Sequence, residues 1–288
     1  MAKIISNRQL IDAPASGPLR YGVFAAAAAM PQMDTRLIGA GLQFNVDHCG
    51  EAQLYDQTCL VNPVKEFDEG SDLMGADPYW VVARKRCGSV GRTAETALRA
   101  ARQQLYTSSQ TLVESVIWNG GGLASVDPLN TLTGAGAVIV TPAAPGAGAA
   151  IAALEEAFYD VYGYAGTIHM NMTGYAAVRY AGLMDRSGGA GVWRTPMGTA
   201  WSIGAGYANT GPDDVAPTSP DSVWAFITPP ITIWRSGVLP QPPARQTFDR
   251  TLNQWDTVAE EVFAHAWDCD AVFAVEVPAG APGVVAVA

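Results

Sequence analysis

Apolar residues recur at helical spacing between residues 89 and 119, in the longest regular pattern of the chain. Ser89, Thr93 and Glu95 stand where a helix start needs capping and acidic side chains. Three consecutive glycines, 120–122, supply its end. No proline interrupts the run, so we predict a single helix on the order of 40 Å long. The apolar positions are Ala94, Ala97, Leu98, Ala101, Leu105, Leu112, Val113, Val116 and Ile117.

Two further helices are expected nearer the middle of the chain, over Gly146–Tyr162 and Tyr175–Met184. Glu155 and Glu156 are adjacent in the first of these, about 100° apart around the helix, so they cannot flank one substrate atom. We expect both carboxylates to be exposed to solvent. The apolar face of this helix is predicted to comprise Ile151, Leu154, Ala157, Phe158 and Val161.

Short β-rich runs follow the helices, and Gly204–Pro220 reads as a long, turn-rich loop between two of them. The last two runs flank a tight turn at Asp268–Asp270 and are expected to form a hairpin. Together with the helices, these strands predict an α+β fold. The predicted strands are Thr167–Met172, Thr199–Ile203, Val223–Thr228, Ile231–Arg235, Asp256–Trp267 and Ala271–Val277.

The first 88 residues are predicted to be mostly extended. Prolines and glycines interrupt residues 1–45, which we expect to form an arm that lies across a neighbouring copy. Leu54–Val61 and Tyr79–Ala83 read as the two strands of a long hairpin, with the charged segment 65–72 as its tip. An arm and a hairpin of this kind would require other subunits to cover them.

Charge is scarce and unevenly placed. Only 15% of the residues are charged and the net charge is −10, whereas a free nucleic-acid binder is normally basic. About a third of the positive charge lies between residues 84 and 102, and we interpret it as a solvated surface rather than a DNA contact. The residues concerned are Arg84, Lys85, Arg86, Arg92, Arg99 and Arg102.

Local motifs for catalysis, metals or cofactors are missing from the sequence. The cysteines form no C-x-x-C pair, so we expect neither a zinc site nor another cofactor, and we expect free, buried thiols. No signal peptide or membrane span is expected. His169 and His265 are expected to be structural histidines. We predict that the chain is not an enzyme, with a hydrolase built from distant residues such as His169 and Asp185 as one alternative. The four cysteines are Cys49, Cys59, Cys87 and Cys269.

Several phrases of the sequence resemble the major capsid proteins of tailed bacteriophages, whose fold is shared with encapsulin nanocompartments. They are A-A-L-E-E-A-F-Y-D-V-Y-G at 152–163, G-T-I-H-M at 166–170, T-P-M-G at 195–198 and G-A-G-Y at 204–207. The long helix, ending I-W-N-G-G at 117–121, looks like the spine helix of such proteins. The resemblance covers roughly residues 45–277 and implies that capsid fold.

The resemblance also implies how the chain divides. Residues 1–45 would form the N-terminal arm and 46–88 the extended hairpin loop. Residues 89–145 would form the spine helix and the first part of the peripheral domain, and 146–240 the axial domain. Residues 241–288 would supply the return strands of the peripheral domain and the C-terminal end. Many members of the family begin with a charged helical scaffold segment, and none precedes the arm in this sequence.

The implied function is structural. The chain would self-assemble, without a cofactor, into hexamers and pentamers of an icosahedral virion shell that encloses double-stranded DNA without sequence specificity, and assembly would take place in the host cytoplasm. The resemblance leaves open whether a separate scaffolding protein, a portal and decoration proteins also bind. No membrane partner is implied. An encapsulin-like compartment is the alternative within the same fold.

Contacts between subunits are expected on and beside the hairpin, and the loop Gly204–Pro220 is expected near a symmetry axis. Lys65 is the only lysine in the presumed tip, where some members of the family form a covalent crosslink, but an exposed lysine is ordinary surface. The residues expected to contact an adjacent subunit are Phe67, Leu73, Tyr79, Trp80, Arg84 and Arg86.

Overall fold

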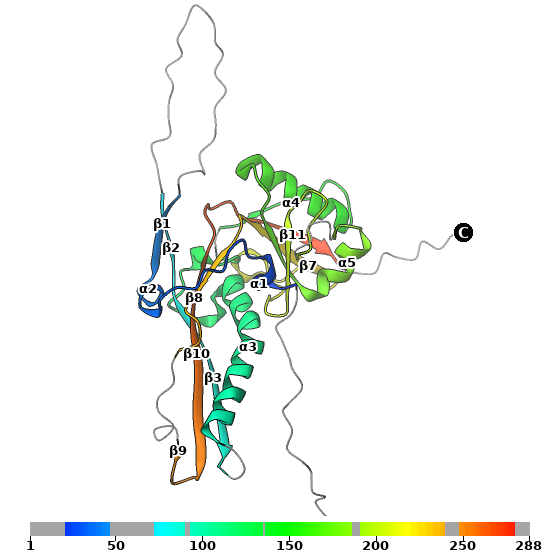
Figure 1. Cartoon of the computed structure of the whole chain (residues 1–288). Helices are drawn as coiled ribbons and strands as arrows, with labels where there is room; N and C mark the ends of the chain where they lie inside the picture. Colours follow the sequence, from blue (N-terminus) through cyan, green and yellow to red (C-terminus); the bar gives the residue numbers. More distant parts are fainter. Residues whose placement is uncertain are drawn as a thin grey trace, which may run out of the picture.

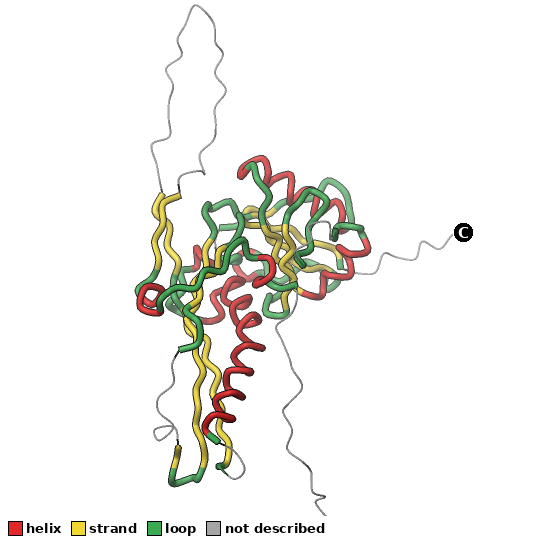
Figure 2. The backbone as a smooth tube through the Cα atoms, viewed as in Figure 1, coloured by secondary structure: helices red, strands yellow, loops and turns green. Residues whose placement is uncertain are grey.

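The fold is mixed α+β, with one long helix and two separate larger sheets, as the computed structural model shows (Figures 1 and 2). The structure describes residues 21–46, 72–89, 93–134, 136–185, 191–239 and 248–279. Both the α+β class and the long helix predicted from the sequence are therefore confirmed.

The first sheet has four strands and forms an elongated limb with the long helix α3 (Ala94–Asn119). Figure 1 shows α3 running beside two long strands of this sheet. β10 pairs antiparallel with β3 along ten residues, from Gln254 opposite Gly88 to Phe263 opposite Tyr79. The strands are β3 (Tyr79–Gly88), β8 (Thr232–Arg235), β9 (Phe248–Asp249) and β10 (Gln254–Ala266).

The ends of α3 are fixed by the residues expected to cap it. The Thr93 side chain accepts a hydrogen bond from the Thr96 backbone N–H, and the Thr96 hydroxyl accepts one from the Thr93 N–H. At the other end Gly120 adopts φ 77°, a left-handed conformation that glycine reaches without strain. Local signals alone therefore set both limits of this helix.

The second sheet has five strands in the order β4-β11-β7-β5-β6. Helix α4 (Ala147–Tyr162) packs against β11 and β7, and the short helix α5 (Tyr175–Tyr180) lies beside α4. All five residues of β6 are buried, which explains why this strand reads as a continuous apolar run. The strands are β4 (Val138–Ile139), β5 (Thr167–Asn171), β6 (Ala200–Gly204), β7 (Ser222–Thr228) and β11 (Phe273–Pro278).

The expected hairpin near the C-terminal end is wrong. β10 belongs to the four-stranded sheet, whereas β11 lies in the five-stranded sheet between β4 and β7. The bends at Asp268–Asp270 therefore carry the chain from one sheet to the other. β8, placed by the sequence in the same unit as β5–β7, pairs instead with β10.

The two sheets share one apolar cluster, which gathers around the C-terminal half of α3. Trp118 is fully buried there, with its ring edge-on to Phe226 at 5.0 Å and tilted against Tyr207 at 5.3 Å. Its indole N–H donates to the carbonyl oxygen of Thr210 at 3.1 Å. Trp118 therefore fixes the long helix to the five-stranded sheet and to the loop that follows β6.

Residues 21–46 pack against their own chain, so the prediction that the whole segment 1–45 is an arm crossing a neighbour is wrong for them. Val23 and Ile38 are fully buried. The backbone between them runs along β8, with bridges from Ala29 to Thr232 and from Gln32 to Arg235. Residues 1–20 lie outside the described residues. The elements of this segment are α1 (Val23–Ala26), α2 (Thr35–Gly39) and β1 (Leu42–Val46).

An antiparallel ribbon stands where the sequence predicts a long hairpin, but with different strands. β1 pairs with β2 (Asp72–Ala76), from Leu42 opposite Ala76 to Val46 opposite Asp72. The expected strand Leu54–Val61 lies outside the described residues. Tyr79–Ala83, expected as the return strand, belongs to β3 and pairs with β10, so that assignment is wrong.

Turns of 3₁₀ helix link several of these elements. The loop between β6 and β7 contains one of them and is irregular elsewhere, as predicted for Gly204–Pro220. None of the helices among the described residues is long and apolar enough to span a membrane. The 3₁₀ turns are η1 (Gly120–Gly122), η2 (Pro128–Asn130), η3 (Met172–Gly174) and η4 (Pro212–Asp214).

The cysteines depart in part from the expectation of free, buried thiols. Cys87 is free and buried in β3. Cys269 is disulfide-bonded, so the expectation is wrong for this residue. Cys49 and Cys59 lie outside the described residues.

Candidate assembly surface

β3 presents two chemically different faces. Its alternation places Tyr79, Val81 and Ala83 against α3 and the core, while Trp80 and Val82 point outward and are about half exposed. β3 is also an edge of the four-stranded sheet, because β10 is its only strand partner among the described residues. The outer face and one edge of β3 are therefore both available to another molecule.

The structure describes three of the apolar residues that were expected to contact a neighbour, and these three differ in their exposure to solvent. Leu73 in β2 and Trp80 in β3 are exposed by 62% and 51%. Tyr79 is 2% exposed, and its hydroxyl lies 3.2 Å from Nδ1 of His265 while burial raises its pKa far above the usual range. The Tyr79 side chain is thus occupied by its own chain. Phe67 and Lys65 lie outside the described residues.

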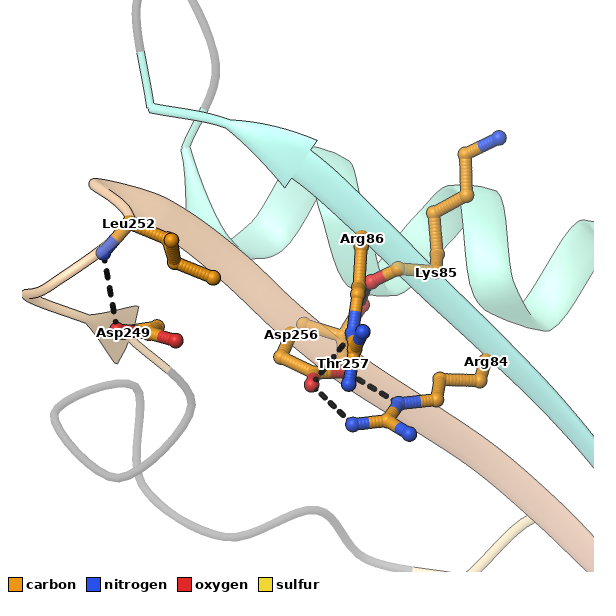
Figure 3. Close-up of polar contacts among 7 residues, drawn as sticks. All are labelled: Arg84, Lys85, Arg86, Asp249, Leu252, Asp256 and Thr257. Atoms are coloured by element: carbon orange, nitrogen blue, oxygen red, sulfur yellow. Dashed lines mark hydrogen bonds and ion pairs between the residues drawn. The ribbon is translucent and has the colours of Figure 1, made fainter.

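Arg84 and Arg86 continue the outward face of β3 and converge on one carboxylate of β10 (Figure 3). Nε of Arg84 donates to Oδ1 of Asp256 at 2.7 Å, and Nε of Arg86 donates to Oδ2 at 3.0 Å. Hydrogen bonds from Arg84 and then Arg86 lower the pKa of Asp256 to about 2. Figure 3 shows Lys85 pointing away from this cluster. One carboxylate faces two guanidinium groups, so the surface remains basic.

Exposed apolar side chains also occur around the C-terminal end of α4, where sequence reasoning placed none. Val161, expected on the buried face of that helix, is 60% exposed, and Tyr164 and Met197 are exposed as well. The Tyr159 hydroxyl donates to the carbonyl oxygen of Met197 at 3.3 Å, which holds the turn 195–198 beside α4. The sequence signal was the excess of apolar residues over what one helix face can bury.

Glu155 corrects a second expectation about α4. It is buried, not exposed, and its Oε1 accepts a hydrogen bond from the Thr195 hydroxyl at 2.6 Å. The same hydroxyl accepts the backbone N–H of Thr199 at 3.2 Å. Glu155 therefore anchors the T-P-M-G turn from the helix, and its role is structural. Glu156 is exposed, as expected.

The buried histidines are held as structural groups. Nδ1 and Nε2 of His169 lie 3.0 Å from the hydroxyls of Tyr207 and Thr228, and burial lowers the pKa of His169 to about 3. Nε2 of His265 lies 2.8 Å from the carbonyl oxygen of Asn130, and burial lowers its pKa to about 4. Both ring nitrogens of His169 are engaged, which leaves neither for a carboxylate such as Asp185.

A groove of about 920 Å³ opens between α5 and the start of α4, on the five-stranded unit. Its lining is mostly alanine and glycine, with Asp221 and Tyr180 as its titratable side chains. Within the described part of the chain, no three His, Cys, Asp or Glu residues are grouped so that they could hold a metal ion. The groove offers no set of convergent groups from which a reaction could be built.

No protein-family model matches the sequence, and no curated protein matches it. Solved structures do match, over almost the whole chain. A chain from the capsid of Ralstonia phage GP4 is 11% identical, with 98% of this chain and 97% of that chain covered and a TM-score of 0.52. A chain from the capsid of a native GTA particle is 16% identical, with 93% and 95% covered and a TM-score of 0.52.

A third match, from Mycobacterium phage Ogopogo, is 13% identical and covers 94% of this chain and 97% of that chain, with a TM-score of 0.51. Identities this low establish the fold and nothing finer. Because each alignment extends over both sheets and the long helix, the likeness concerns the whole architecture rather than one unit. This chain therefore has the fold of phage and GTA capsid proteins.

Proposed function

We propose that this protein is the major capsid protein of a tailed bacteriophage, a structural subunit that self-assembles and catalyses nothing. One observation carries the proposal: the fold matches capsid chains along 93–98% of its length, with TM-scores just above 0.5. The subunits would form hexamers and pentamers of an icosahedral shell around double-stranded DNA, in the virion, after assembly in the host cytoplasm. Heterologous contacts of one kind close into rings when their rotation closes.

The two sheets suggest how the subunit would be oriented. We propose the five-stranded sheet with α4 and α5 as the axial domain, and α3 with the four-stranded sheet as the spine and peripheral domain. The loop 204–220 and the exposed Tyr164 and Met197 would then lie toward the symmetry axis. The hairpin region 46–88 would overlap a neighbour and contact it through Leu73 and Trp80, whereas Phe67 and Lys65 lie outside the described residues.

The outer face of β3 supports a contact between copies. Trp80 and Val82 expose apolar area that their own chain leaves uncovered, and Arg84 and Arg86 add positive charge beside it. The chain as a whole carries a net charge of −10, so a second copy offers an excess of carboxylates to this positive charge. Apolar contact flanked by opposite charge is the arrangement that specific interfaces use.

Two alternatives remain distinguishable. An encapsulin-like compartment would use the same fold and the same self-association but enclose a protein cargo instead of DNA. A hydrolase is less supported, because His169 is fully engaged by Tyr207 and Thr228. Scaffolding, portal and decoration proteins would be additional partners of the capsid, and no cofactor is needed for any of these contacts.

The size of the purified full-length protein tests the proposal. Light scattering should detect particles in the megadalton range, or capsomers of five and six subunits that convert to such particles. Nuclease-protected DNA inside particles produced in infected cells would separate a capsid from a compartment with protein cargo. A stable monomer or dimer at every concentration would contradict the proposal.

Replacing Trp80 with serine tests the β3 contact. Because about half of the side chain is already exposed in the single subunit, the variant should still fold, with a loss of stability of no more than about 1.5 kcal/mol. Loss of a buried interface tryptophan should raise the concentration needed for assembly at least about tenfold. Leu252→Ser, at an exposed leucine in the turn before β10, is the control. Equal assembly by both variants would remove β3 from the interface.

A further inference from the structure

The carboxylate of Glu114 lies where three separate segments of the chain meet. Glu114 belongs to α3 and is fully buried. Its Oε1 accepts the backbone N–H of Val23 at 3.2 Å, and its Oε2 accepts the backbone N–H of Gly206 at 3.0 Å. One side chain thus binds the N-terminal segment with one oxygen and the loop after β6 with the other.

Glycines make this close approach to α3 sterically feasible. A Cβ atom at Gly22 would lie 2.2 Å from Oε1 of Glu114, and one at Gly204 would lie 2.3 Å from its carboxyl carbon. A Cβ atom at Gly206 would lie 1.9 Å from the carbonyl oxygen of Thr111. At Gly206 the obstacle is backbone, so a larger residue would displace the loop, and at Gly22 and Gly204 a larger residue would displace the Glu114 carboxylate itself.

The charge of Glu114 is balanced by hydrogen-bond donors. Burial raises the pKa of Glu114, and the hydrogen bonds from the backbone N–H groups of Gly206 and Val23 oppose that rise. The charge of Glu114, together with burial as the larger cause, raises the pKa of Tyr207. Among the ion pairs of the described residues, none includes Glu114. The hydrogen bonds from the backbone N–H groups to Glu114 therefore have no ion pair among the described residues to substitute for them.

We propose that Glu114 couples the local opening of the N-terminal segment 21–26 to that of the loop 205–210, a link that we call the joint. When one segment opens, the other should open more readily. Each oxygen needs its own donor, because a buried carboxylate with an unfilled hydrogen-bonding position is costly. Displacing either segment weakens the hold on the other. Such coupling is reciprocal, so its strength should be equal when measured from either end.

Hydrogen exchange of the full-length, unassembled protein tests the joint through Glu114→Gln. The amide NH₂ group of glutamine faces one of the two backbone donors and leaves it without an acceptor. The coupling predicts faster exchange at both Val23 and Gly206, by roughly tenfold to a hundredfold, the equilibrium equivalent of one charge-assisted hydrogen bond. The Ile203 N–H, which donates to the carbonyl oxygen of Tyr21 at 2.9 Å, shows whether the rest of this region stays paired.

Glu155→Gln is the matched control. Glu155 is also a buried helix carboxylate, but it anchors the turn 195–199 through Thr195. The same substitution there should leave the exchange of Val23 and Gly206 unchanged. Faster exchange at only one of these two amides in Glu114→Gln, or at neither, would overturn the proposal.

Two glycine variants measure the reciprocity and serve if Glu114→Gln does not fold. Gly206→Ala should push the loop off Thr111 and accelerate exchange at Val23, and Gly22→Ala should accelerate exchange at Gly206. If each alanine accelerates exchange only in its own segment, the segments are independent and the joint does not exist. Hydrogen exchange is measured on single subunits, so its outcome does not depend on whether the protein assembles into a shell.

Discussion

His169 and His265 make the stability of the subunit depend on pH. Their pKa values in the folded chain are about 3 and about 4, against 6.5 for an unperturbed histidine. As pH falls below 6.5 the unfolded chain takes up protons first, so folding stability falls down to about pH 4 through both residues and to about pH 3 through His169 alone.

The expected loss between pH 7 and pH 5 is roughly 2 kcal/mol for each histidine, measured by urea unfolding of the unassembled chain. His169→Gln should remove about half of that slope. The pKa of Glu114 is raised in the folded chain, so its protonation adds stability as the pH falls, opposite to the effect of the histidines. The difference between wild type and His169→Gln therefore isolates the contribution of His169. A wild-type stability that is flat between these pH values would contradict the assignment.

Individual side chains were the hardest feature to predict from sequence. Glu155 and Glu156 are neighbours of the same type, yet one is buried against Thr195 and the other is exposed. Tyr79 and Trp80 are adjacent aromatics, yet only Trp80 faces outward. In each pair, the residues that bury one of the two side chains lie on a distant segment of the chain. No local sequence pattern predicts which segment that is.

At the scale of the elements, the capping of α3 gives a direct prediction. Thr93→Ala removes the side chain that accepts the Thr96 N–H and should lower the free energy of unfolding by about 1 kcal/mol. Thr107→Ala is the control, because the Thr107 hydroxyl donates only to carbonyls of its own helix, and it should be neutral or slightly stabilising. Chemical unfolding of both variants measures the difference, and equal effects would show that the cap contributes nothing.

The elements themselves were predictable where local physics decides them. Helical spacing and glycine stops predicted α4 and the end of α3 nearly to the residue and the start of α3 within five residues, and alternation or apolar runs located β5, β6, β7, β10 and β11. Strand pairing was not predictable in the same way. β10 and β11 are separated by one short turn, which favours a hairpin, but the order of strands in two sheets is decided by packing between residues far apart in the chain.

For the whole molecule, the main departure from expectation is the N-terminal segment. Residues 21–46 bury Val23 and Ile38 in their own chain, so less of the polypeptide depends on neighbours than its prolines and glycines indicate. Among the described residues, the surfaces left for the proposed contacts with neighbours are the outward face of β3, the end of α4 and the turn at Met197. The sequence predicted the fold class and a capsid-like resemblance because those rest on element order, which local patterns carry.

Electron microscopy of the purified full-length protein tests the central claim most directly. Self-assembly predicts closed shells built from clusters of five and six subunits, with the five-stranded unit at the centre of each cluster and the α3 limb around it. Images that contain only separate particles of one or two subunits, at concentrations well above those of an infected cell, would contradict the account.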